Sequence, residues 1–233
     1  HDALPISAEQ TRTGRALRGL YEWVREDYDP AILIRMLRER LLRTDRWLDR
    51  EKDDEDAPSL RPHEAATLLA GRSYESGWDG LLGGLHSAVK SLEKDVEDQP
   101  DEAQLDRERR HLKRLVLLTD YVEDLVELLP SPDDDNVRRG DVRTLAENSC
   151  TFLQTFGPLD PVEDVPEEER TLDQAARQLL YDRLTRLSEM EVSCEASDRQ
   201  LAAMMGRWLD EQAVQAQRPR PGQQRPVGPH QAV

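Results

Sequence analysis

Apolar residues recur at three- and four-residue steps along most of the chain, which is the spacing that lines up side chains on one face of an α-helix. The pattern runs from Glu9 to Arg25 and resumes at Ile32 toward Trp47. Between the two stretches, Asp29-Pro30 offers a capping carboxylate followed by a proline suited to a first helical turn. We therefore predict an N-terminal helical pair within residues 8–56, whose last part joins a charged loop over residues 50–60.

A second region, residues 62–214, carries six more helical stretches and is predicted to form a helical bundle. Thr171 and Ser197 each stand three residues before a glutamine, a capping-box pattern that satisfies exposed amides at a helix start. No alternating run typical of a strand is present, and no fixed-period repeat occurs. The predicted fold class is therefore all-α, an irregular bundle of about eight helices. The six stretches are Arg61 to Gly71, Trp78 to Val96, Asp101 to Leu129, Asp141 to Phe156, Thr171 to Met190 and Ser197 to Leu209.

Three segments are expected to lie outside the helices. Residues 157–170 are rich in proline and acid and predict a loop, whereas residues 217–233 predict a disordered tail. The chain begins with His1, and residues 1–7 look like a translated sequencing adapter. We treat residues 1–7 as an artefact and expect that the reading frame is truncated.

Composition narrows the class of function. The chain has 233 residues with a net charge of −16, 37% hydrophobic and 5% aromatic residues. Such acidity disfavours wrapping nucleic acid as an isolated module, because phosphate contacts need clustered Lys and Arg. No apolar run is long enough to cross a bilayer, so a cytoplasmic protein without membrane contact is predicted. Cys150 and Cys194 are interpreted as buried thiols, with a disulfide as the alternative.

Candidate chemistry is sparse, and we predict no catalytic, cofactor-binding or metal-ligating residue. A phosphate-binding loop is absent, and the glycines of residues 80–84 indicate close helix packing or a kink. The histidines, among them His86 and His111, lack a metal-binding spacing. Ser76 and Ser149 lack a nucleophile elbow. The acidic clusters are interpreted as solvated loops that lack the spacing of a calcium-binding loop; they lie at residues 53–56, 133–135 and 163–169.

The densest basic run contains Arg107, Arg109, Arg110, Lys113 and Arg114. Such a run is able to contact a phosphate backbone. Because Asp106 and Glu108 are interleaved with it, a solvated helix surface is the favoured interpretation.

Three stretches together resemble a known family. They are residues 20–37, with an acidic break before a leucine-rich helix; residues 62–81, which run into Gly77-Trp78; and residues 152–187, which contain the acidic loop. Their order resembles the helical part of the B subunit of AddAB-type ATP-dependent helicase–nucleases, PD-(D/E)XK exonucleases that process broken DNA ends. The resemblance covers most of residues 17–222 and is one of pattern, without a motif that carries over a functional residue. Pro219 to Gly222 stand where that family resumes its helicase core, but the expected strand does not follow here.

The resemblance implies an accessory helical subdomain of a helicase-like protein that docks on a companion helicase–nuclease subunit. DNA contact is then expected only within the full complex, and the nuclease residues of the parent would lie outside this fragment. The alternative is a free-standing acidic helical module for protein interaction or regulation. A third possibility, a carboxylate enzyme on a helical bundle, is weakest because Glu-x-x-His pairs are missing. A fragment would also expose apolar surface, for which the candidates are Trp23, Trp47, Trp78 and Trp208.

Overall fold

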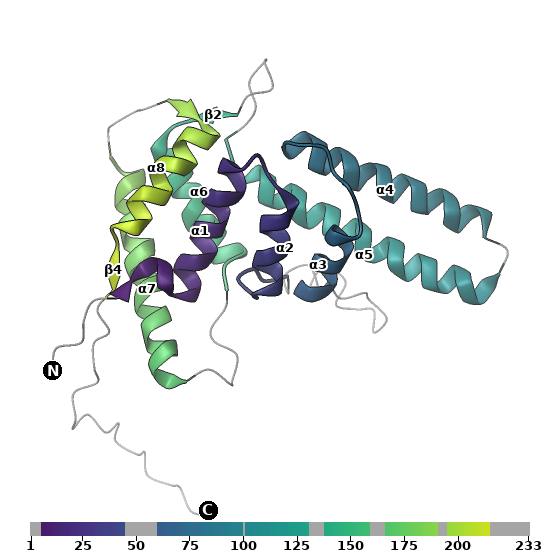
Figure 1. Ribbon diagram of the computed structural model, residues 1–233, viewed down its shortest axis with the longest axis horizontal. Coiled ribbons are helices and arrows are strands. Elements are labelled where there is room, and N and C mark those ends of the chain that lie inside the picture. The colour runs from purple at the N-terminus through teal and green to yellow at the C-terminus, as the bar shows by residue number, and fades with distance from the viewer. Residues whose placement is uncertain are drawn as a thin grey trace, which may run out of the picture.

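The computed structural model describes residues 6–44, 60–99, 101–130, 138–158, 166–190 and 195–214. Within these ranges eight α-helices form an irregular bundle, which confirms the predicted all-α class (Figure 1). A short 3-10 helix, η1 (Ala8–Gln10), precedes them. The helices are α1 (Arg12–Arg25), α2 (Pro30–Arg38), α3 (Pro62–Ala70), α4 (Trp78–Asp98), α5 (Glu102–Glu127), α6 (Val142–Thr155), α7 (Glu167–Ser188) and α8 (Asp198–Asp210).

Two pairs of short antiparallel strands accompany the helices, although the sequence predicted none. β1 (Ile6–Ser7) pairs with β4 (Ala213–Val214), and β2 (Arg139–Gly140) pairs with β3 (Ala196–Ser197). Each strand has two residues, which is too short for an alternating pattern to register in the sequence. Ile6 and Ser7 fall in the segment that we set aside as an artefact. The tail at residues 217–233 lies outside the described residues.

Helix α1 occupies the centre of the fold. It lies along α8 and also contacts α2, α6 and α7, so nine of its residues are buried. Gly19 allows α2 to approach, because a Cβ there would lie 2.6 Å from the Met36 Sδ. The described parts of residues 8–56 and 62–214 therefore share a single hydrophobic core.

The ends of α1 and α2 are set by Schellman motifs that use residues other than glycine. Asp27 and Arg40 adopt left-handed φ angles of 59° and 54°. After α1, the Tyr28 amide donates to the Trp23 carbonyl over 2.8 Å, and after α2 the Leu41 amide donates to the Met36 carbonyl over 2.9 Å. The prediction that the second helix continues toward Trp47 is therefore wrong, because Arg40 reverses the chain.

Two capping predictions had opposite outcomes. At α8, the Gln200 amide donates to the Ser197 hydroxyl over 3.3 Å and the Gln200 side chain accepts from the Ser197 amide over 3.1 Å, which confirms that capping box. The box at Thr171 is wrong, since α7 begins four residues earlier and the Thr171 hydroxyl donates to the Glu167 carbonyl. Proline precedes three glutamates in the first turn of α7, where negative charge favours the helix dipole. Part of the loop predicted at residues 157–170 is consequently helical.

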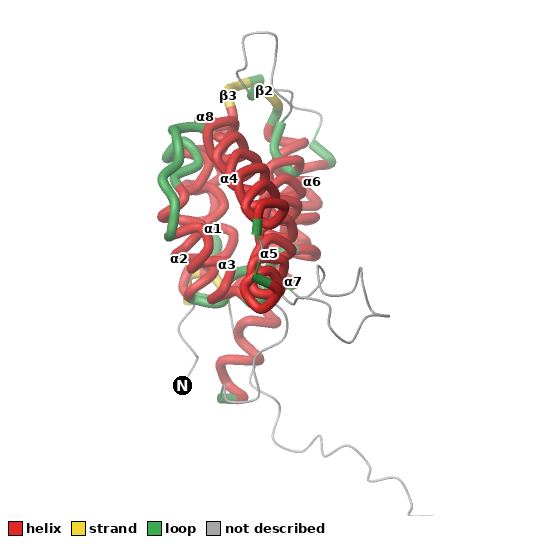
Figure 2. The backbone as a smooth tube through the Cα atoms, turned by 90° about the vertical axis from the view of Figure 1, so that its right-hand side faces the viewer, coloured by secondary structure: helices red, strands yellow, loops and turns green. Residues whose placement is uncertain are grey.

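Helices α4 and α5 form a hairpin that projects from the rest of the bundle, which we call the arm (Figure 1); Figure 2 views the arm from its free end. His86 of α4 and Glu123 of α5 are joined by a contact of 2.7 Å between Nε2 and Oε1. The glycines of α4 confirm the prediction of close packing at two positions: a Cβ on Gly80 would lie 2.6 Å from the Glu75 carbonyl oxygen, and one on Gly84 would lie 2.8 Å from the Tyr74 ring. Gly83 faces open space.

The tryptophans do not form an exposed apolar surface in the described residues. Trp23 is buried, and Trp78 and Trp208 are half-buried against the core. Trp47 lies outside the described residues. The expectation of exposed tryptophan surfaces is therefore wrong for Trp23, because it lies on the face of α1 that packs into the core.

A buried arginine joins the arm to the body. Arg138 is only 6% exposed, and its guanidinium donates to the Pro130 carbonyl over 2.6 Å at the end of α5. The same nitrogen lies 3.4 Å from the Val126 and Leu129 carbonyl oxygens. The guanidinium carbon stands 4.3 Å from the centre of the Trp78 ring, at the first residue of α4. Arg138 thus contacts both helices of the arm where they enter the body.

We expect Arg138→Ala to lower the free energy of unfolding by about 2–4 kcal/mol, because carbonyls at the end of α5 would be left unsatisfied in a buried position. Urea unfolding followed by circular dichroism measures this loss. Arg183→Ala on the exposed surface of α7 is the matched control, with an expected change within about 0.5 kcal/mol. Equal stability of the two variants would contradict the role given to Arg138.

Candidate functional site

Several residues considered for chemistry have structural roles. The Ser149 hydroxyl is buried, shares a hydrogen bond of 2.9 Å with the Tyr21 hydroxyl and donates to the Leu145 carbonyl over 2.7 Å. Cys150 is buried beside Tyr181 and Thr185, and burial raises the pKa of its thiol. Both side chains lie in the interface between helices.

No group of three or more potential metal-ligating side chains occurs within the described ranges. His63 and His86 are exposed on helix surfaces, and His86 is engaged with Glu123. Cys194, and the acidic clusters at residues 53–56 and 133–135, lie outside the described residues. In the described part of the chain, no helix is both long and apolar enough to cross a membrane.

The basic run on α5 divides between two faces of that helix. Arg107, Arg110, His111 and Arg114 are three, four and seven residues apart and therefore lie on one side of the helix, which we call the basic face. Together with Gln104 and Glu108 they line a surface hollow of about 880 Å³ on the arm. Arg109 lies outside the hollow, 4.0 Å from Asp106. Sequence reasoning identified the run but missed this division.

The positive charges of the basic face are poorly compensated. Within the described residues, Arg107 and Arg110 have no ion-pair partner, and Arg114 stands 3.8 Å from the Glu64 carboxylate. The Glu108 carboxylate accepts from the side-chain amides of Gln99 and Gln104. The hollow therefore presents guanidinium groups that are available to an anion.

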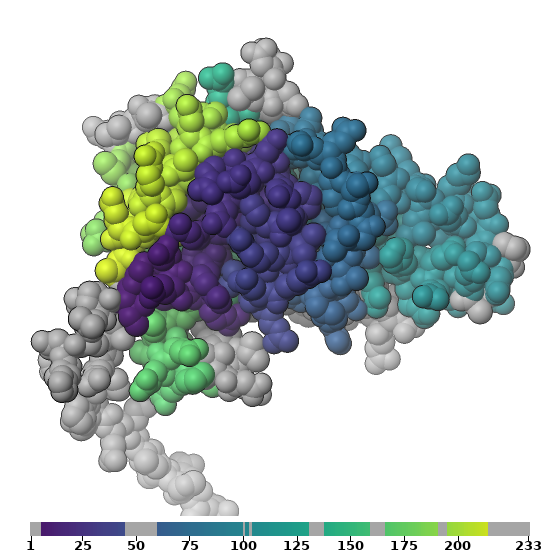
Figure 3. Space-filling model, viewed as in Figure 1, coloured from purple at the N-terminus to yellow at the C-terminus, as the bar shows by residue number. Residues whose placement is uncertain are grey.

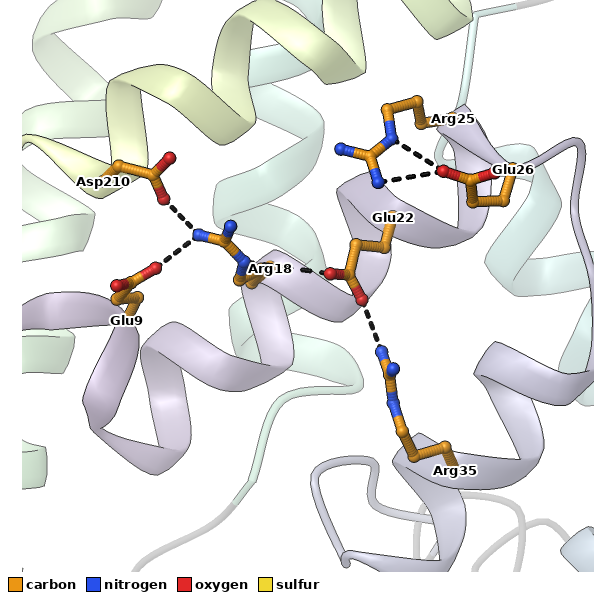
Figure 4. Close-up of polar contacts among 7 residues, drawn as sticks. All are labelled: Glu9, Arg18, Glu22, Arg25, Glu26, Arg35 and Asp210. Carbon is orange, nitrogen blue, oxygen red and sulfur yellow. Dashed lines mark hydrogen bonds and ion pairs between the residues drawn. The ribbon is translucent and has the colours of Figure 1, made fainter.

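Other arginines of the protein are held in ion-pair networks. Figure 4 shows Arg18 of α1 between Glu9 and Asp210, with Glu22 shared between Arg18 and Arg35. The hydrogen bond to Asp210 raises the pKa of Arg18. This network surrounds two arginines with three carboxylates, so it leaves no excess of positive charge, and it connects η1, α1, α2 and α8. The basic face differs from this network because Arg107 and Arg110 have no such carboxylate partners among the described residues.

His111 reports the positive potential of this surface. Its pKa is lowered from its ordinary value of 6.5 by desolvation first, and then by the charges of Arg72, Arg114 and Arg107. Arg72 follows α3, so positive charge from a second element reaches the basic face. A surface of this kind, in a chain of net charge −16, favours anions such as phosphate.

Comparison with protein-family models, with curated proteins and with solved structures finds no significant match to this chain. The assignment of a function therefore depends on the geometry of the chain itself.

Removing the charge of Arg72 tests the layout of the basic face. In Arg72→Gln we expect the pKa of His111 to rise toward 6.5, because one fewer positive charge opposes protonation of the imidazole. An NMR titration of the His111 ring protons measures the change. Arg109→Gln on the same helix should leave this pKa unaltered, and an unchanged pKa in Arg72→Gln would mean that the two groups are far apart in solution.

Proposed function

We propose that this chain is a structural helical region of a subunit that processes DNA double-strand breaks, of the helicase–nuclease kind that its sequence pattern resembles. It is non-catalytic as an isolated fragment, and its basic face contacts nucleic-acid phosphates within the full complex. The observation that carries this proposal is that Arg107 and Arg110, which line the hollow on α5, have no ion-pair partner among the described residues.

The charges of the basic face suit a phosphate backbone better than a single small anion. Arg107, Arg110 and Arg114 follow one another along the helix, which matches successive phosphates along a strand more closely than one enclosed group. Each neutralised phosphate releases counterions and adds affinity that falls with salt. Every residue that lines the hollow is charged or polar, whereas a typical small-molecule pocket is lined mainly by hydrophobic and aromatic side chains.

The position of the basic face also supports contact with a large partner. The arm projects from the body (Figure 1), and the basic face runs along α5 from Arg107 to Arg114, where it meets Glu64 of α3. The net charge of −16 nevertheless opposes binding by the fragment alone. A companion subunit would supply the remaining contacts, consistent with DNA being held only by the assembled complex.

The resemblance and the helices coincide, which supports the proposed parent. Residues 20–37 cover the last part of α1 and nearly all of α2, and residues 62–81 cover α3 and the start of α4. Residues 152–187 include the end of α6 and nearly all of α7. Each stretch that carries the resemblance thus corresponds to consecutive helices of the fold.

A DNA-binding measurement tests the basic face. At low salt, where the attraction of the basic face is screened least, we expect fluorescence anisotropy with a labelled single-stranded oligonucleotide to show residual binding weaker than about 10⁻⁴ M, which the net charge of −16 opposes at physiological salt. The double variant Arg107→Glu with Arg110→Glu should abolish this binding. The matched double variant Arg109→Glu with Lys113→Glu changes the net charge equally on the same helix, but both residues lie outside the hollow. Equal loss in the two double variants would contradict the proposed face.

The same preparations allow the non-catalytic part of the proposal to be tested. We expect no hydrolysis of ATP and no degradation of linear DNA by the purified chain. The proposal would be overturned by a hydrolytic activity that remains when the protein is purified to constant specific activity. That activity would also have to change when a residue of this chain is substituted.

A further inference from the structure

Helices α2 and α3 leave a groove between them that the proposed DNA contact does not use. The two helices lie side by side, in the middle of the face shown in Figure 3. The groove has a volume of about 680 Å³. Its apolar lining consists of Pro30, Ala31, Ile34, Leu69, Ala70 and Tyr74.

The rim of the groove is unbalanced in charge. Among the described residues, Arg38 and Arg72 have no carboxylate partner. The two acids of the lining are already engaged: the Asp29 carboxylate caps α2 by accepting from the Ala31 amide over 2.9 Å, and the Glu39 carboxylate lies 3.9 Å from Arg15. An incoming carboxylate therefore meets two arginines without displacing an existing pair.

We propose that this groove docks an acidic and apolar peptide segment of a partner protein. Its apolar side chains lie against Ile34 and Tyr74, and its carboxylates pair with Arg38 and Arg72. Two features select this occupant. The apolar floor can bury the apolar side chains of a peptide, whereas a phosphate backbone has none to offer. The two arginines attract carboxylates, although the net charge of the whole chain is negative.

The groove and the basic face differ in the chemistry they offer. Apolar side chains make up about half of the groove lining, whereas the hollow on α5 is lined by polar and charged side chains. A segment with leucines on one side and glutamates on the other fits the groove in the way that an amphipathic helix fits an apolar channel with a charged rim. The proposal does not depend on the DNA contact, because no described residue lines both the groove and the hollow.

The test uses a fluorescein-labelled peptide built on repeated Glu-Glu-Leu-Leu units, titrated with the full chain at moderate salt. A second peptide carries serine in place of each leucine. We expect the leucine peptide to bind and the serine peptide to bind at least about tenfold more weakly, since the floor of the groove would be left without apolar contacts.

Three variants assign the binding to the groove. Arg38→Glu reverses one rim charge and should weaken binding of the leucine peptide at least about tenfold. Ala31→Gln places a longer side chain on the exposed floor and should weaken binding without a change of charge. Arg183→Glu on α7 repeats the charge reversal at an exposed position outside the groove and should leave the affinity unaltered.

The outcomes separate the two proposals. Arg107→Glu with Arg110→Glu should leave peptide binding intact even though it abolishes DNA binding. Equal binding of the two peptides, no effect of Ala31→Gln, or no saturable binding at all would each overturn the docking site. A loss of DNA binding in Arg38→Glu as large as in the basic-face variant would do so too, because the groove would then be part of the nucleic-acid surface.

Discussion

The orientation of the arm depends on one desolvated cation. Arg138 gives its guanidinium to carbonyl groups at the end of α5 and stacks on Trp78 at the start of α4. Its backbone carbonyl also accepts from the amide of Asp198, the first residue of α8, over 3.0 Å. Burial lowers the pKa of this guanidinium, whereas its electrostatic interactions with Tyr28 and Asp198 raise it. A planar group with several donors suits this junction, because carbonyls converge on one edge while an aromatic ring covers its face. The start of α4 and the end of α5 both contact Arg138, so the basic face on α5 keeps a defined position relative to the body.

The other arginines that the structure describes are of two kinds: some are paired with carboxylates, and others have no carboxylate partner and can bind an anion. In the body, Arg18 and Arg35 are held by Glu9, Glu22 and Asp210, so that they connect helices and contribute little net potential. Exposed pairs of this kind stabilise a fold only weakly. By contrast, Arg107 and Arg110 on the arm and Arg38 and Arg72 at the α2–α3 groove have no carboxylate partner among the described residues. An acidic chain thereby keeps two local surfaces that attract anions, and the excess of carboxylates elsewhere restricts binding to those surfaces.

The helical periodicity of the sequence was sufficient to predict all eight helices, because each buries a stripe of leucines and aromatics at regular spacing. The ends that were mispredicted depend on tertiary context. No glycine marks the end of α2, where Arg40 itself takes the left-handed conformation, and the first turn of α7 lies in a segment whose proline and acids resemble a loop. The basic run was visible in the sequence, but its separation into Arg107, Arg110 and Arg114 on one side and Arg109 on the other required the helix phase. The groove could not be predicted, since α2 and α3 come together only through the fold. The role of Arg138 could not be predicted either, because it depends on the meeting of three segments that are distant in sequence.

Arg72 links the two surfaces electrostatically. It lines the α2–α3 groove, and its charge is also felt by His111 on the basic face. A carboxylate bound at Arg72 would cancel part of that charge, so the pKa of His111 would rise while the attraction of the basic face for phosphate would fall. Because coupling between two binding sites is reciprocal, phosphate at the basic face would weaken the acidic peptide to the same degree. Salt would reduce this coupling, since interactions between exposed charges are largely screened beyond about 8 Å at physiological ionic strength. Electrostatic coupling through Arg72 predicts that the leucine peptide raises the apparent dissociation constant for DNA. This rise should be absent in Arg72→Gln and smaller at high salt. A rise that persists at high salt would instead indicate a movement of the arm.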